Sequence, residues 1–158
     1  MRVLWKRLSS SVLPVILLLS GCQEQSFKAD LVSPEAEVRV RAIEFLGSQR
    51  DRDAIPRLSE ALRDSVVEVR AKAAWALGML QAKGSVIEVC ALLGDSEPRV
   101  RQSASRALMQ MEEPDALPAL REALGGEPDE WVRKDLEEAI AHLGQFEGES
   151  DLGEASFR

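Results

Sequence analysis

Few side chains in this chain could carry covalent or metal chemistry. There is one histidine, His142, and there are two cysteines, Cys22 and Cys90. Nucleophilic catalysis needs a general base within reach, and zinc or non-haem iron needs several imidazole or thiolate ligands. The sequence offers neither set, and it contains no glycine-rich phosphate-binding motif. We therefore expect no enzyme activity, no metal site and no cofactor, with His142 on the surface and Cys90 as a buried structural thiol.

A second set of polar side chains recurs at fixed spacing. An acid stands six positions before an arginine in three places, and the pairs are Asp64 and Arg70, Asp95 and Arg101, and Glu127 and Arg133. Ser33 holds the same place before Arg39. Short polar side chains at such turns could cap the following helix by accepting hydrogen bonds from its first free N–H groups.

The same spacing reveals an internal repeat. A valine precedes each of these arginines, and the steps between successive valines are 31, 31 and 32 residues, for Val38, Val69, Val100 and Val132. A period of this length is typical of a solenoid, in which each repeat packs only on its neighbours.

Two amphipathic segments in each period must position these side chains. Apolar residues follow each valine at spacings of three and four, which predicts a helix with one buried face. A shorter helix is predicted before each turn, over residues 54–62, 85–93 and 116–124. Pro56 and Pro118 stand near the start of two short helices, where a missing N–H costs little. The expected fold class is all-α.

The first 22 residues have the pattern of a secretory leader. Basic residues within positions 1–7 precede an apolar run over 12–19, which is shorter than the ~20 residues that span a bilayer. The run ends in Leu19-Ser20-Gly21-Cys22, which resembles the lipobox of bacterial lipoproteins at all four positions. The alternative is an ordinary signal peptide followed by an incidental cysteine.

The lipobox resemblance implies an anchored protein of the cell envelope. Residues 1–21 would be removed, Cys22 would be acylated with palmitate-like chains, and residues 22–30 would form a polar tether. Two or three acyl chains hold a protein firmly at a membrane. Gln23, where an aspartate would favour the inner membrane, favours the outer membrane facing the periplasm in a Gram-negative host.

The charge balance argues against some classes of binding partner. The chain has 20 basic and 27 acidic residues, a net charge of −7, which becomes −10 without the three basic residues of the leader. An acidic surface repels polyanions, so we expect neither nucleic-acid binding nor electrostatic adhesion to anionic lipid.

The repeat units resemble HEAT repeats. The run Val-Arg-x-x-Ala-Ala-x-Ala-Leu-Gly at residues 69–78 is similar to the short form first named for phycobilisome lyases. The resemblance covers residues 31–144 and implies a right-handed α-solenoid of HEAT-like helix pairs, with one leading helix over 34–48 and three helix pairs after it. It also implies that turn acids and helix arginines of neighbouring units form a ladder, and that the Val-Arg helices line the concave face. The ladder residues would be Asp64, Arg70, Asp95, Arg101, Glu127 and Arg133.

The two ends of the stack are expected to differ from its middle. Residues 27–31 would supply a fragment of a first short helix. Charged residues at 135, 137 and 138 indicate a terminal capping repeat with one solvent-exposed (wet) face. Residues 145–158 combine glycines with acids and are expected to form a disordered acidic tail.

Side chains on the concave face are candidates for partner binding. When each Val-Arg helix is numbered from its valine as position zero, positions 3, 6 and 10 point away from the core. The candidates at these positions are Arg41, Lys72, Trp75, Met79, Arg106 and Gln110. Aromatic, methionine and arginine side chains are enriched in protein-binding hot spots. The alternative is that Trp75 fills a gap between repeats and the cations are ordinary surface, while Trp131 packs within the end unit.

The leading functional hypothesis is a lipid-anchored HEAT-repeat scaffold that binds an unidentified protein partner in the bacterial cell envelope. One alternative is a bilin lyase or chaperone related to the phycobilisome lyases. Another is a structural envelope lipoprotein without a specific client.

Overall fold

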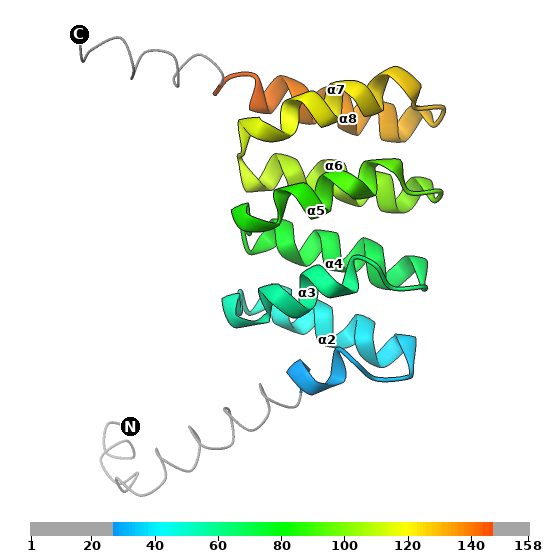
Figure 1. The fold of residues 1–158 in the computed structure, drawn as a ribbon, viewed down its shortest axis with the longest axis vertical. Coiled ribbons are helices and arrows are strands. Elements are labelled where there is room, and N and C mark those ends of the chain that lie inside the picture. The colour runs from blue at the N-terminus through cyan, green and yellow to red at the C-terminus, as the bar shows by residue number, and fades with distance from the viewer. Residues whose placement is uncertain (1–26, 147–158) are drawn as a thin grey trace, which may run out of the picture.

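Two layers of helices form a stack along one axis (Figure 1). The structure is a computed structural model that describes residues 27–146. The long-helix layer contains α2 (Ala36–Ser48), α4 (Val67–Met79), α6 (Pro98–Met111) and α8 (Glu130–Leu143). The short-helix layer contains α3 (Ile55–Ala61), α5 (Val86–Ala91) and α7 (Leu117–Gly126). Each long helix packs directly on the next one, so the expected all-α solenoid is confirmed.

The predicted leader, Cys22 with its acyl chains, and the tail from residue 147 onward lie outside the described residues. Within residues 27–146, no helix has the length and apolar character that crossing a bilayer requires.

Short 3-10 turns introduce the short helices. These turns are η1 (Arg52–Ala54), η2 (Lys83–Ser85) and η4 (Pro114–Ala116), while η3 (Leu92–Gly94) follows α5. Pro56 and Pro118 lie in the first turns of α3 and α7, where the helix leaves backbone N–H groups unpaired in any case. The segment predicted as one helix over 85–93 is therefore divided between α5 and two 3-10 turns.

A core of small side chains lets the long helices approach each other closely. Val69, Ala73 and Leu77 of α4 are fully buried. A methyl group on Gly78 would lie 2.8 Å from the Cα atom of Ala107 in α6, which is closer than van der Waals contact allows. The helices can therefore pack at this separation only because residue 78 lacks a side chain.

The N-terminal end of the stack is covered by a fragment of helix. Residues 27–30 are helical, and the Phe27 ring stacks on Phe45 of α2 with 4.0 Å between ring centroids. Lys28 also pairs with Asp51 at 2.7 Å. Phe27 and Lys28 thus cover the first long helix at this end of the described residues.

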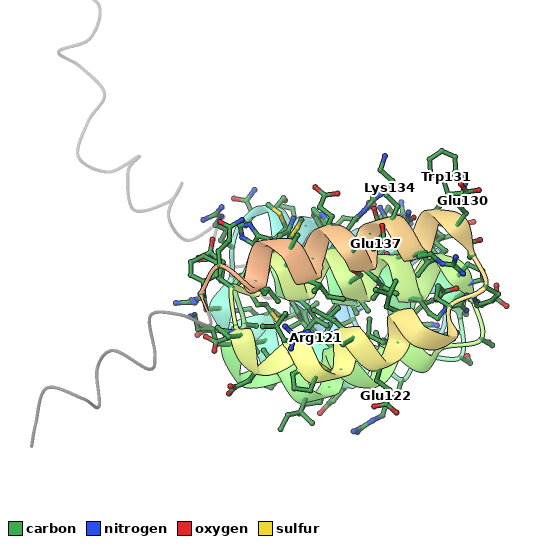
Figure 2. All side chains as sticks on the ribbon, turned by 90° about the horizontal axis from the view of Figure 1, so that it is seen from above. Arg121, Glu122, Glu130, Trp131, Lys134 and Glu137 are labelled. Atoms are coloured by element: carbon green, nitrogen blue, oxygen red, sulfur yellow. The ribbon has the colours of Figure 1, made fainter. Side chains whose placement is uncertain are left out.

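The C-terminal end carries charge where the interior repeats bury small side chains. Lys134 and Glu137 of α8 are exposed, whereas the equivalent Ala71 and Ala74 of α4 are buried. Figure 2 looks onto this last repeat, with Glu137 lying over the α8 ribbon toward the viewer. A charged outer surface of this kind suits the end of a solenoid, because solvent replaces the next repeat.

Two expectations about this end were wrong. Asp135 is not part of the wet face: it is half-buried and pairs with Arg106 at 2.9 Å, because position 3 of a long helix faces the preceding repeat. Trp131 does not pack within the end unit. Its side chain is 70% exposed, since it lies one helical step from the buried Val132, and it projects away from α7 beside Lys134 (Figure 2).

Candidate functional site

The turn acids and helix arginines form bidentate pairs between successive repeats. Arg70 donates from Nε to Oδ2 of Asp95 at 2.7 Å and from Nη2 to Oδ1 at 2.9 Å. Its Nη1 donates to the carbonyl oxygen of Asp64 at 2.9 Å. One guanidinium therefore joins its own turn to the turn of the next repeat, in the fork geometry that only arginine offers.

The same arrangement occurs at the neighbouring levels of the stack. Arg39 donates to both carboxylate oxygens of Asp64 at 2.8 and 2.9 Å, and Arg101 donates to both of Glu127 at 2.7 Å. The glutamate at 127 takes the place of an aspartate without breaking the pattern. We call these three pairs the ladder.

Each turn acid also accepts a backbone hydrogen bond, but not the predicted one. Oδ1 of Asp64 accepts from the N–H of Val66 at 2.8 Å, and Oδ1 of Asp95 accepts from Glu97 at 3.0 Å. Val66 and Glu97 are the N-cap residues themselves, so the acid closes an Asx turn before the helix and does not cap its first free N–H groups. The side chain cannot reach those groups because it is held on the preceding repeat's arginine.

Two of the three ladder pairs shift the pKa values of their members. Hydrogen bonding from Arg70 holds the pKa of Asp95 below its usual value, and hydrogen bonding from Arg101 lowers the pKa of Glu127 in the same way. The same bonds raise the pKa of each arginine. The carboxylates are therefore held in the charged form, which suits a structural contact and not a general acid.

The last arginine has only half of this arrangement. Nη2 of Arg133 donates to the carbonyl oxygen of Glu127 at 2.7 Å, and no carboxylate within residues 27–146 pairs with it. The ladder thus ends at α8 together with the stack.

Two of the three predicted partner-binding cations, Lys72 and Arg106, are already paired with an acid of an adjacent long helix. Lys72 pairs with Glu44 of α2, and its Nζ lies 5.9 Å from the ring centroid of Trp75. The Trp75 ring lies over Gly47, whose missing side chain leaves it room. Trp75 is half-buried and fills this gap, which is the alternative reading of its role.

The remaining predicted residues fall into two groups, and only one of the groups lines a groove. Arg106 pairs with Asp135, and Arg41 is exposed with its Nε 3.4 Å from the carbonyl oxygen of Glu37. Met79 and Gln110 lie near the C-terminal ends of α4 and α6 and line a groove of about 500 Å³. The structure therefore separates the predicted set: Met79 and Gln110 line the groove, while Arg41, Lys72, Trp75 and Arg106 do not.

The groove runs across the C-terminal ends of the long helices, from α2 to α8. Its lining residues come from all four repeats and are Arg50, Gly78, Met79, Gln81, Met109, Gln110, Glu112, Glu138 and His142. The His142 ring is half-buried and packs edge-on against Phe146, with 5.6 Å between ring centroids. Cys90 lies in the short-helix layer, where burial raises the pKa of its half-buried thiol and disfavours the reactive thiolate.

Sequence reasoning predicted only Met79 and Gln110 of the nine groove residues, and three of those that it missed belong together. Arg50, Gln81 and Glu112 stand just after the ends of α2, α4 and α6, beyond positions 3, 6 and 10 that were predicted to face away from the core. All three stand at position 12 counted from the repeat valine. The signal was therefore available as a recurring position where the residue type changes from cation to amide to acid.

The fold and the groove define a solenoid of helical repeats. A family model described as HEAT repeats matches residues 27–89 and 67–141, so this chain belongs to the HEAT-repeat family. No curated protein matches it in sequence.

Several solved structures have the same fold. One is the complex of CpcE and CpcF of phycocyanin lyase from Nostoc sp. PCC7120, with 25% identity, a TM-score of 0.70, and coverage of 77% of this chain and 53% of that chain. Another is human deoxyhypusine hydroxylase in complex with glycerol, with 23% identity, a TM-score of 0.67 and coverage of 87% and 49%. An engineered protein matches at 20% identity and a TM-score of 0.63, with coverage of 80% and 64%. This chain spans about half the length of the first two proteins.

Proposed function

We propose that this protein is a lipid-anchored scaffold of the bacterial cell envelope that binds a protein partner in the groove. The observation that carries the proposal is the set of charged groove side chains left without protein partners. Among the described residues, Arg50, Glu112 and Glu138 line the groove and make no ion pair, whereas Lys72 and Arg106 nearby are paired. Unpaired charge beside half-buried methionines is a surface that a partner can complete.

The same geometry supports a binding role over catalysis. The polar groove residues Arg50, Gln81 and Glu112 come from successive repeats, and packed helices lie about 8–10 Å apart. Catalytic groups must meet within hydrogen-bond distance of one reacting bond, and no side-chain hydrogen bond or ion pair joins these three described residues to one another. We therefore propose that the protein has no enzymatic activity and that the groove recognises an extended surface.

The groove is tested by affinity capture from detergent-solubilised envelopes with the full chain and a Met79→Ala/Met109→Ala variant. Both methionines line the groove, so partners that bind there should be lost from the variant. Ile87→Ala is the matched control, because Ile87 is 83% exposed on the short-helix layer. An identical set of partners from the wild type and the groove variant would refute the assignment, once thermal unfolding shows that the variant is folded.

The anchor is tested by labelling cells with a palmitate analogue. The sequence Leu19-Ser20-Gly21-Cys22 supports acylation at Cys22, and Cys22→Ser should abolish the label and release the protein from membranes. Equal labelling of the two proteins would reject the anchor. Separation of the inner and outer membranes of the labelled cells then shows which membrane holds the wild type.

A second candidate is a bilin lyase-like or chaperone-like protein. The likeness to the complex of CpcE and CpcF, at 25% identity, favours it over an enzyme of another class. The matched structure is a complex of two proteins, so the test includes a second subunit. Mixing the protein with bilin and an apo-phycobiliprotein, with and without such a subunit, tests this candidate by the appearance of the covalent chromophore.

A further inference from the structure

Three groove residues share an unusual backbone conformation. Arg50, Gln81 and Glu112 have φ angles of 56°, 47° and 54°, in the left-handed region that side chains disfavour. In the part of the chain that the structure describes, no glycine has a positive φ. The chain therefore uses large polar residues at the positions where glycine would cost least.

Hydrogen bonds at the ends of α2 and α4 show why the conformation is required there. The N–H of Arg50 donates to the Gly47 carbonyl oxygen at 3.2 Å, and the next N–H, of Asp51, donates to Leu46 at 3.0 Å. The same pair of bonds recurs at Gln81 and Ala82, which donate to Gly78 and Leu77 at 2.9 and 3.0 Å. This is the Schellman arrangement, whose left-handed position is most often glycine. The left-handed turn directs the chain into the next short helix, and the side chains at this position line the groove.

The side chains of this row change along the stack in a definite order. Arg50 lies at the α2 end, Gln81 follows in the middle, and Glu112 lies at the α6 end with Glu138 of α8 lining the same groove. Met79 and Met109 are half-buried groove residues between them. The groove is thus positive at one end, apolar and neutral in its middle, and negative at the other end.

This order defines the chemistry of the ligand. We propose that the groove binds an extended peptide segment of a protein partner, lying along the stack axis, with an acidic residue at Arg50 and a basic residue at Glu112 and Glu138. Apolar side chains of the peptide lie over Met79 and Met109, whose flexible thioethers adapt to them. This inference rests on the proposed function of the groove and names the partner segment that it recognises.

The spacing of the repeats sets the spacing of the two charges. Arg50 and Glu112 are separated by two repeats, so at about 10 Å per packed helix their levels lie roughly 20 Å apart. An extended chain advances ~3.3 Å per residue, so the acidic and basic residues of the peptide are about six residues apart. A helical segment rises ~1.5 Å per residue and would place the same two charges about 13 residues apart, so the best-binding charge separation distinguishes the extended form from a helix.

The test uses fluorescein-labelled peptides that contain one aspartate, one lysine, and alternating leucine and serine elsewhere. Only the separation and the order of the two charges differ among them. Fluorescence polarisation with the full chain in mild detergent should give the tightest binding near a separation of six residues. Replacing aspartate by asparagine, or lysine by glutamine, should weaken binding about tenfold each.

Glycine substitutions make the test specific to the groove side chains. Arg50→Gly keeps the left-handed turn and removes the cation, so this variant should no longer distinguish the aspartate and asparagine peptides while it still requires lysine. Glu112→Gly should show the reciprocal behaviour. Arg41→Ala, an exposed cation outside the groove, is the control and should bind all peptides as the wild type does.

Binding that is independent of charge separation would overturn the proposal. So would an Arg50→Gly variant that weakens the aspartate and asparagine peptides equally. If the peptides fail in this way but partner capture still depends on Met79 and Met109, the extended-peptide proposal is wrong and the groove function stands. If capture is also unaffected by the methionine substitutions, both are wrong.

Discussion

The two ends of the long helices carry the same kinds of side chains and use them in opposite ways. At the N-terminal ends, arginines and acids pair between repeats, and the same contact recurs at three levels. At the C-terminal ends, Arg50 and Glu112 occupy equivalent positions with no such partner among the described residues. A contact that recurs at each level and pairs both charges holds neighbouring repeats together. A position whose charge differs from repeat to repeat, and whose side chain has no partner among the described residues, is available to another molecule.

Acid should affect the ladder most, because it acts on Asp95 and Glu127 together. The pKa of Asp95 and of Glu127 is lowered in the folded protein, so each contributes stability above its unfolded pKa of about 4 and loses it as the pH falls through the lower folded value. The free energy of unfolding should therefore decrease below about pH 4. Urea titrations between pH 7 and pH 2 measure this free energy. The Asp95→Asn/Glu127→Gln variant should have a lower free energy of unfolding at pH 7, and that free energy should depend less on pH.

Breaking one rung should have the next largest effect. Arg70→Ala leaves the Asp95 carboxylate, 9% exposed, without its guanidinium, and we expect a loss of about 3 kcal/mol in the free energy of unfolding. Arg99→Ala is the control, since that arginine is 61% exposed and its partner Glu68 is 33% exposed, so their pair should contribute less than about 1 kcal/mol. Equal losses from the two variants, measured by urea unfolding, would contradict the structural role of the ladder.

A methyl group between α4 and α6 should disturb the stack more moderately. In Gly78→Ala the new Cβ meets the Ala107 Cα at 2.8 Å, so the helices must separate, at an expected cost of about 2 kcal/mol. Gly84→Ala is the matched control, because a Cβ there has no atom within 4 Å. Thermal unfolding of both variants separates the effect of the close approach from the general effect of replacing glycine.

Substitutions at the C-terminal ends of the long helices should change the stability least. Gln81→Gly relieves a left-handed backbone but loosens the unfolded chain, so we expect a net change within about 0.5 kcal/mol. Gln102→Gly, in the middle of α6, should cost about 1 kcal/mol, since glycine is a poor helix former. Should the two glycine variants lose equal stability, the distinction between the two helix ends would be weakened.

Local pattern was enough to predict much of this molecule. The period of the valines and the spacing of apolar residues predict the long helices, because helical geometry depends on residues three and four apart. The turn acids and their arginines could be singled out in the same way, and the HEAT resemblance supplied their pairing. The split of residues 85–93 into 3-10 and α segments could not be predicted, since it depends on how the short helix meets the adjoining layer.

The partner-binding surface was harder to predict for a physical reason. Periodicity places Lys72 and Arg106 on an open face correctly, but it does not show that Glu44 and Asp135 of adjacent helices neutralise them. It also does not show that Trp75 fills the space over Gly47. Each of these contacts joins residues about one repeat apart, so it depends on the register between helices.

The amino-acid sequence by itself therefore determined the repeat and the helices, because these follow from spacing within one period, whereas the pairing of the turn acids with arginines of neighbouring repeats was implied by the HEAT resemblance. The tertiary structure alone decided which charged side chains remain unpaired, that Asp135 faces inward and Trp131 outward, and that Arg50, Gln81 and Glu112 line one groove. The stacking of one repeat on the next sets all of these, and it brings together side chains that are separated by a full period of the chain.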